Sequence, residues 1–147
     1  NETEIDRLPE LDDVNRATLE DYLDYLDGQA LKPSSIGGKT WRIYSLLKFT
    51  EFKDLRTTTR GDIKAFHRHR KKTCSPHTVA NDIVDLRVFF KWLLPDQAEE
   101  MFLDIKVKRP KPEMADGEVI RPEDVRRLLT ACDTQRDRAL IAVLWET

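Results

Sequence analysis

The sequence predicts an all-α protein, and three observations carry this prediction. Apolar residues recur with a period close to 3.6 over most of the chain, whereas the period-2 alternation of strands is nearly absent. Capping residues, or a proline at the first helical position, precede several of these apolar stretches. Only five of the 147 residues are glycine, and no GxGxxG or P-loop string occurs. The sequence therefore gives no indication of a glycine-rich phosphate loop.

The first two helices are predicted from their caps and their apolar faces. Thr18 and Asp21 resemble a capping box that opens a helix over residues 19–27, and Gly28 is a plausible stop. A second helix is predicted over residues 35–52, where apolar side chains recur on one face.

The next two helices have stronger start signals. Thr59 is predicted to be the N-cap of a third helix that runs toward Arg70. Ser75 is a good N-cap for a fourth helix, because Pro76 then occupies the first helical position, where its missing N–H has no consequence. An apolar stripe over residues 79–93 gives this helix an unbroken buried face.

A basic linker is predicted over residues 105–118, where two prolines and four cations disfavour a helix. We therefore expect one domain over residues 1–104 and a second segment over residues 119–147. In that segment one helix begins at Pro122 and a strongly apolar helix follows over residues 137–147. No partner element follows the last helix, so we expect the sequence to be cut there.

Charge is distributed unevenly along the chain, although the net charge is only −2. Residues 1–30 contain ten acids and two cations, residues 31–111 contain nine acids and eighteen cations, and residues 112–147 contain eight acids and five cations. A basic middle segment favours a partner with a phosphate backbone. The alternative is a solvated helical surface on which charges of one sign happen to cluster.

A metal site is not expected from the histidines and cysteines. His67, His69, Cys74 and His77 lie close together in the sequence, and zinc accepts such ligands. However, His67 and His69 are two residues apart and point in different directions on a helix. Cys74 and Cys132 are a poor case for a disulfide, which favours a reduced, intracellular protein. We expect no metal and no cofactor.

The candidate nucleophiles and acids are expected to have structural roles. Tyr22, Tyr25 and Tyr44 lie on amphipathic stretches, where packing is the usual role.

No stretch approaches the length of a membrane span, and the N-terminus lacks signal-peptide features, so we expect a cytoplasmic protein without membrane contact. One aromatic set is predicted to pack or, alternatively, to contact bases: Trp41, Phe49 and Phe52.

Four segments in this order resemble the tyrosine recombinases, also called the phage-integrase family. Residues 74–93 are similar to the pattern S-x-x-T-x-x-x-x-L-x-x-L-R-x-F-F-x-W-L, and residues 55–66 to I-T-x-x-D-I-x-x-F. Residues 119–129 are similar to L-T-x-E-E-V-x-x-L-L, and residues 135–147 to x-R-D-R-A-L-I-x-x-L-x-x-T. Each motif alone is weak, but their order and spacing cover nearly the whole chain.

The resemblance implies a SAM-like core-binding helical bundle followed by the first helices of a truncated catalytic domain. It implies double-stranded DNA and other protomers of the recombinase as partners, and no small-molecule substrate. The first catalytic arginine of the family would follow Thr147, and none of the three tyrosines matches the context of the family's nucleophile. We therefore expect this chain to bind DNA without cleaving it. The alternatives are a self-sufficient helical DNA-binding regulator and a helical protein–protein adaptor.

The resemblance also implies which residues contact DNA, since the family's second and fourth helices reach the major groove and its linker follows the DNA backbone. The second helix supplies Lys39, Arg42, Ser45 and Lys48. The fourth supplies His77, Thr78, Asn81, Arg87 and Lys91, and the linker supplies Lys106, Lys108, Arg109 and Lys111. The basic loop before the fourth helix adds Lys71 and Lys72, whose flexible ammonium groups suit phosphate contact.

Two residues of the fourth helix have competing interpretations. At about 100° per residue from Val79, Asn81 faces away from the apolar stripe and Arg87 lies at its boundary. Asn81 is predicted either to be solvated or to read a base edge. Arg87 is predicted either to contact DNA or to pair with an acid such as Asp82 or Glu51.

Overall fold

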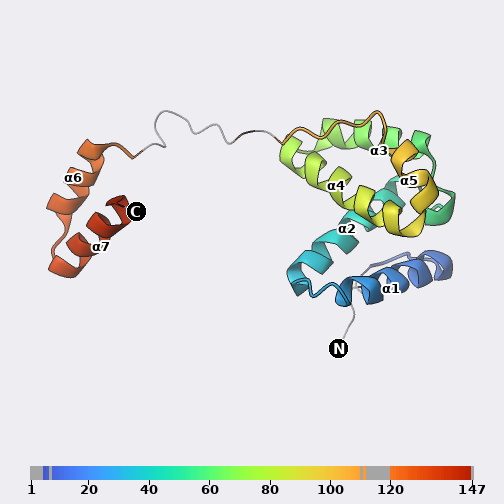
Figure 1. Cartoon of the computed structure of the whole chain (residues 1–147), viewed down its shortest axis with the longest axis horizontal. Helices are drawn as coiled ribbons and strands as arrows, with labels where there is room; N and C mark the ends of the chain where they lie inside the picture. The colour runs from blue at the N-terminus through green and yellow to red at the C-terminus, as the bar shows by residue number, and fades with distance from the viewer. Residues whose placement is uncertain (1–4, 7, 110, 112–119, 147) are drawn as a thin grey trace. The chain divides into compact units, whose positions relative to one another are not determined.

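The computed structural model describes residues 5–6, 8–109, 111 and 120–146. In these residues the secondary structure is entirely helical, which confirms the predicted fold class (Figure 1). The chain divides into two compact units, residues 1–110 and 111–147. The helices are α1 (Asp13–Asp27), α2 (Pro33–Phe49), the 3₁₀ turn η1 (Leu55–Thr57), α3 (Arg60–Thr73), α4 (Pro76–Leu93), α5 (Pro95–Met101), α6 (Pro122–Ala131) and α7 (Gln135–Glu146).

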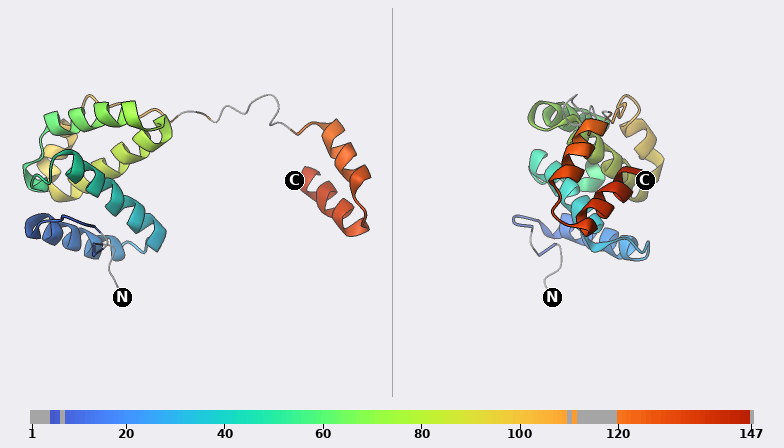
Figure 2. Two further views of the ribbon diagram at one scale, coloured as in Figure 1. Left: turned by 180° about the vertical axis from the view of Figure 1, so that it is seen from behind. Right: turned by 90° about the vertical axis from the view of Figure 1, so that its left-hand side faces the viewer.

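The first unit is organised around α4, which packs against α2, α3 and α5. Leu86, Phe89 and Phe90 of α4 are fully buried, and they form the centre of a core to which α1, α2, α3 and α5 also contribute. The views in Figures 1 and 2 place α1 on one side of this unit and α3 on the opposite side. The apolar stripe predicted for the fourth helix is therefore the buried face of the central helix.

Several predicted helix ends are confirmed. The Thr59 side chain and the Asp62 carboxylate form a reciprocal capping box at the start of α3. The Ser75 hydroxyl accepts a hydrogen bond from the backbone N–H of Thr78, and α4 begins at Pro76. Gly28 is the C-cap of α1. These signals depend on residues within one helical turn, so a single sequence is sufficient to predict them.

The predicted start of the first helix is wrong. α1 begins at Asp13, and Asp12 is its N-cap, whose side chain accepts a hydrogen bond from the N–H of Asn15. Thr18 is instead buried within the helix and donates its hydroxyl proton to the carbonyl of Val14. The acid at Asp12 provides an earlier cap, which extends the helix by a turn and a half beyond the apolar stretch.

The second helix is shorter than predicted at its C-terminus. α2 ends at Phe49, and Glu51 and Phe52 adopt positive φ angles of 52° and 58°. The N–H of Phe52 donates to the carbonyl of Leu47 at 2.7 Å, which closes the helix end. This turn directs the Phe52 ring against Tyr44, and their ring centroids lie 6.0 Å apart. Packing of the aromatic ring therefore ends the helix before residue 52.

The first unit continues past Asp104, where we placed its boundary. Ile105 is buried, and Val107 packs against the same core. The extended segment 105–109 therefore begins as part of the packed bundle. Whether the two units are a core-binding domain and a catalytic-domain fragment stays a prediction.

The second unit is a helical pair. α6 begins at Pro122, as predicted, and the carboxylate of Asp124 accepts a hydrogen bond from the N–H of Arg121. α6 packs against α7, and Val125 is buried between them.

Candidate nucleic-acid interface

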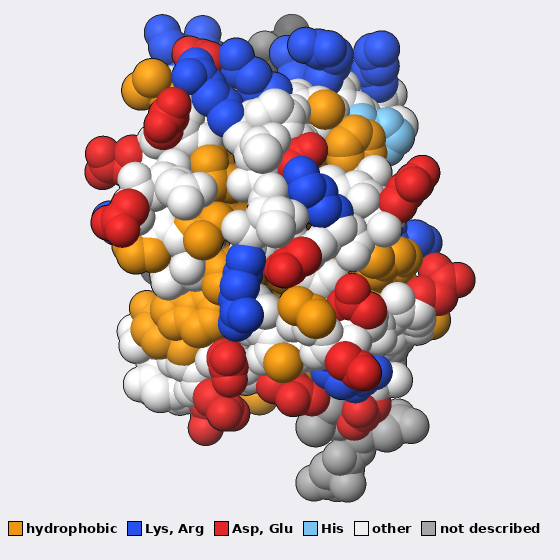
Figure 3. Space-filling view, turned by 90° about the vertical axis from the view of Figure 1, so that its right-hand side faces the viewer, with side chains coloured by type: hydrophobic (Ala, Val, Ile, Leu, Met, Phe, Trp, Pro, Cys, Tyr) orange, Lys and Arg blue, Asp and Glu red, His pale blue; other side chains and the backbone are white. Residues whose placement is uncertain are grey.

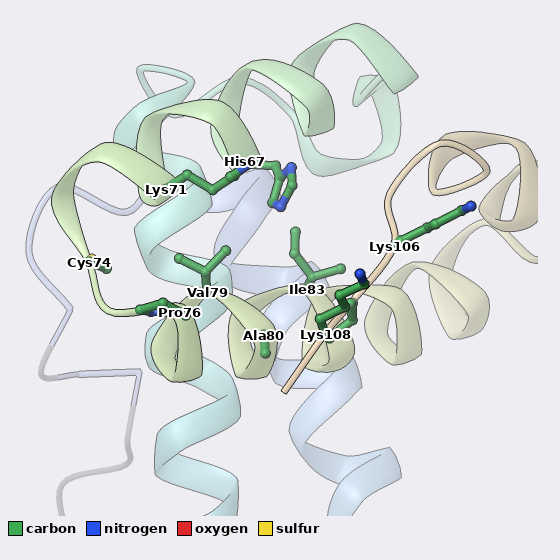
Figure 4. Close-up of a pocket in the computed structure, with 10 residues that line it drawn as sticks. His67, Lys71, Cys74, Pro76, Val79, Ala80, Ile83, Lys106 and Lys108 are labelled. Carbon is green, nitrogen blue, oxygen red and sulfur yellow. The ribbon is translucent and has the colours of Figure 1, made fainter. Parts of the chain in front are cut away.

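Two basic segments meet the start of α4 at one edge of the first unit. The last turn of α3 carries Arg70, Lys71 and Lys72, and α4 begins just after this turn. The segment 106–109 passes beside both helices, because Lys106 and Lys108 line the same cavity as Lys71 (Figure 4). The N-terminus of α4 adds the partial positive charge of a helix start. The fold thus places basic groups that are distant in sequence around one site.

The surface charge separates along the first unit. Figure 3 shows most Lys and Arg side chains gathered at the top of the face in view, whereas Asp and Glu side chains are spread over its edges, its middle and its lower part. The acids of α1 are solvent-exposed, among them Asp21, Asp24 and Asp27. Because α1 and α3 lie on opposite sides of the unit, the acids of α1 are kept away from the basic edge.

Two of the predicted DNA contacts on α2 are instead engaged within the protein. Lys39 Nζ lies 2.6 Å from Asp85 Oδ1, and Arg42 Nη1 lies 2.8 Å from Asp85 Oδ2. Arg42 Nε also approaches Asp82 Oδ1 at 3.6 Å, and Arg70 Nε donates to Asp82 Oδ2 at 2.7 Å. We call these five residues the Asp82–Asp85 network. This network joins α2, α3 and α4. In the sequence, only the three-residue spacing of Asp82 and Asp85, which puts both acids on one face of the helix, indicates that it exists.

Arg87 also has a partner within the protein, but this partner is neither Asp82 nor Glu51. Its Nη2 donates to the carbonyl oxygen of Ile105 at 3.0 Å, and its guanidinium lies 5.6 Å from the centroid of the Phe102 ring. The alternative of pairing with Asp82 or Glu51 is therefore wrong. Arg87 instead fastens the start of the segment 105–109 to α4.

Other predicted contacts have no ion pair among the described residues. All of these side chains are exposed to solvent, and they therefore remain available to an external anion. They are Lys48, Lys71, Lys72, Lys91, Lys106, Lys108, Arg109 and Lys111. Lys111 belongs to the second unit, whereas the other seven belong to the first.

The remaining predicted contacts are polar groups on α2 and α4. The Ser45 hydroxyl donates to the carbonyl of Trp41, and the Thr78 hydroxyl lies 3.0 Å from that of Ser75. His77 is exposed at the first turn of α4, and Asn81 is half-buried one turn later. Of these four residues, His77 and Asn81 are the two whose side chains have no hydrogen bond to another described residue.

The curated proteins that match this chain are recombinases. The chain is 34% identical over 97 residues to tyrosine recombinase XerD of Listeria innocua, a match that covers 62% of this chain and 33% of that protein. It is 33% identical over 103 residues to tyrosine recombinase XerD of Listeria monocytogenes, which covers 66% of this chain and 35% of that protein. The chain is related to the tyrosine recombinases. This finding supports the family predicted from the four sequence motifs.

The relationship to tyrosine recombinases covers part of those proteins only. The chain spans about a third of the length of the curated relatives it matches. No family model matches, and no solved structure gives a significant match.

Two of the three tyrosines of this chain lie in the core, as predicted. Tyr22 and Tyr44 are buried, and Tyr44 donates its hydroxyl proton to the carbonyl of Pro9 at 2.8 Å. Burial, with smaller contributions from Asp85 and Tyr25, raises the pKa of Tyr22 to about 12. Burial, together with Glu10, also raises the pKa of Tyr44. Tyr25 is partly exposed and stacks on Trp92, with 5.9 Å between the ring centroids.

The other aromatic side chains considered above, and His67, differ in their surroundings. Phe49 and Phe52 pack against the core, whereas Trp41 is 59% exposed. No group of three or more His, Cys, Asp or Glu residues in the described ranges is arranged to hold a metal ion. His67 lines the cavity between α3 and α4. Burial and the nearby Lys71 ammonium lower the pKa of His67.

None of the described helices is both long and apolar enough to cross a membrane.

Proposed function

We propose that this chain is the DNA-binding portion of a site-specific tyrosine recombinase. Its first unit acts as a core-binding domain that holds duplex DNA, while a catalytic domain cleaves and rejoins the strands. In this proposal the second unit is the N-terminal part of that catalytic domain. Other protomers of the recombinase bind the same DNA.

The observation that carries the proposal is the set of unpaired cations at the junction of α3, α4 and the segment 106–109. Lys71, Lys72, Lys106 and Lys108 have no carboxylate partner within the described residues, whereas Arg70 and Arg42 do. Cations without internal partners bind phosphate groups and release the counterions condensed on DNA. The N–H groups at the start of α4 suit a backbone phosphate at the same edge.

The Asp82–Asp85 network gives the interface its shape. It fixes α2 and α4 relative to each other, and these are the two helices that the family resemblance directs to the major groove. In this arrangement Lys39 and Arg42 act mainly by holding the helices in place. Base recognition then falls to side chains without internal partners, above all Asn81.

The test is DNA binding by the 147-residue chain, measured by fluorescence anisotropy with a random-sequence duplex at several salt concentrations. We expect log K to fall linearly with log salt, with a slope of about −0.9 for each phosphate contacted. Replacing Lys71, Lys72, Lys106 and Lys108 together with Gln should abolish most of this slope.

The matched control replaces one exposed cation away from this edge. Arg56 lies in η1 beside α5, and its guanidinium has no ion pair within the described residues. Arg56→Gln should leave the salt slope unchanged. If the wild-type chain has no salt-dependent affinity for DNA, the proposal is wrong and the protein–protein adaptor becomes the better interpretation.

A further inference from the structure

A cavity of about 310 Å³ lies between α3 and α4 and is bordered by residues 106–108 (Figure 4). Cavities that hold small ligands begin at about 300 Å³. This one is therefore large enough for a small organic molecule. DNA binding uses exposed ammonium groups and does not require an apolar cavity, so the proposed function does not explain it.

The cavity has an apolar floor. Val79 and Ile83 are 6% and 1% exposed, and both side chains point toward His67 in Figure 4. Pro76 and Val107 add further apolar surface to its wall. An apolar ligand group placed here is removed from water, which favours binding.

The rim of the cavity is cationic, and none of the described residues that line it is an acid. Lys71 extends toward His67 and Lys108 lies beside Ile83, whereas Lys106 points away from the cavity centre (Figure 4). Neither Lys71 nor Lys108 has an ion pair with a described residue. Two other cations of α3 are neutralised, since Arg70 pairs with Asp82, and Lys64 with Asp104. The two rim ammonium groups therefore supply a positive potential directly above an apolar surface.

We propose that this cavity binds a small amphipathic carboxylate, with its apolar chain against Val79 and Ile83 and its carboxylate between Lys71 and Lys108. A neutral molecule would leave the two ammonium groups unpaired, and a bare phosphate would leave the apolar wall formed by Pro76 and Val107 exposed to water. The imidazole of His67, whose pKa is lowered by burial and by Lys71, borders the same cavity, and its N–H can donate to the carboxylate.

Sodium octanoate is the probe, and calorimetric titration in the absence of DNA is the first measurement. We expect saturable binding of octanoate, with octanol and inorganic phosphate each binding at least tenfold more weakly. Equal binding of octanol would show an apolar hollow without charge recognition, and equal binding of phosphate would show an anion site alone. Either result overturns the proposal, as does the absence of octanoate binding.

Alkylation of the two free cysteines locates the ligand. Cys74 lines the cavity, whereas Cys132 lies in the second unit and serves as an internal reference. Octanoate should slow the reaction of Cys74 with iodoacetamide and leave that of Cys132 unchanged. Equal slowing of both reactions, or of neither, contradicts the proposed location.

Two charge variants and one control complete the test. Lys71→Gln and Lys108→Gln should each weaken octanoate binding about threefold to fivefold, the range expected for one partly solvated ion pair. Lys91→Gln removes an exposed cation that has no ion pair with a described residue from the far end of α4, and it should have no effect. An unchanged affinity in both rim variants overturns the proposal. Because no DNA is present, the outcome is independent of the proposed function.

Discussion

Arg70 Nε lies 2.7 Å from Oδ2 of Asp82, and this ion pair joins the last turn of α3 to the middle of α4. Asp82 is 1% exposed, and its second partner is Arg42. The side chains of Arg70 and Arg42 each retain some access to water. A buried carboxylate between two guanidinium groups from different helices is sensitive to substitution. Removal of one partner leaves an uncompensated charge, which lowers the stability of the fold. Asp82 therefore controls how α2, α3 and α4 are held together.

Replacing Asp82 with Ala should lower the free energy of unfolding by about 3 kcal/mol. This is the lower end of the range for a broken buried pair, because the two arginines can regain water. Urea unfolding monitored by circular dichroism provides the measurement. Asp21→Ala, which removes an exposed acid from α1, should change stability by no more than about 0.5 kcal/mol. Equal effects of the two substitutions would show that the network contributes little.

Tyr22→Phe should maintain or increase stability at pH 7. The Tyr22 hydroxyl is buried and has no hydrogen-bond partner among the described residues, so its removal relieves a desolvation cost. The surrounding Phe89 and Trp92 rings, with centroids 4.9 and 5.0 Å away, still pack against phenylalanine. A stability loss above about 1 kcal/mol would indicate that the hydroxyl has a partner in solution.

The same tyrosine predicts a pH dependence of stability. Burial raises the pKa of Tyr22 to about 12 in the folded state, whereas the unfolded chain ionises near 10. The neutral form is therefore favoured by folding, and its contribution is complete below pH 10 and is lost as the pH rises toward 12. The midpoint of urea unfolding should therefore decrease more between pH 8 and pH 11 in the wild type than in Tyr22→Phe. Parallel losses in both proteins would contradict this assignment.

Single Lys→Ala substitutions at Lys71, Lys72, Lys106 and Lys108 should weaken binding to specific and random duplexes equally. Lys71 and Lys72 lie in the last turn of α3, not in the loop predicted from the sequence, and Lys106 and Lys108 lie in an extended segment. All four ammonium groups are exposed, and they suit phosphates better than base edges. Each substitution should reduce the salt slope by about one unit, as measured by anisotropy. A loss confined to one DNA sequence would instead assign that lysine to base recognition.

Asn81→Ala should reduce discrimination at one base pair by about 1–3 kcal/mol. Asn81 is half-buried on α4, and its side chain has no hydrogen bond to another described residue, so its removal should not reduce thermal stability. The measurement compares wild type and variant on a library of single-substituted sites, after a preferred duplex has been selected from random DNA. Identical profiles would leave Asn81 as a solvated residue.

The sequence by itself determined the local structure of this protein. The Thr59–Asp62 capping box, the Ser75–Pro76 helix start and the Gly28 helix end all depend on residues within one turn. The apolar period of α4 likewise determined its buried face, because side-chain direction along a helix follows from spacing alone. Such signals are short-range and need no knowledge of neighbouring helices.

Only the tertiary structure decided which polar side chains remain available at the surface. Asn15 hydrogen-bonds to the backbone of Phe52, Lys53 and Leu55, and this distant contact fixes the first turn of α1 against the segment that leads from α2 into η1. Arg87 is likewise engaged by a carbonyl on another segment. A cation's partner depends on which elements pack together, and residues far apart in sequence meet only after the chain has folded. For this reason the sequence located the basic segments, whereas the fold decided which of their cations are already paired.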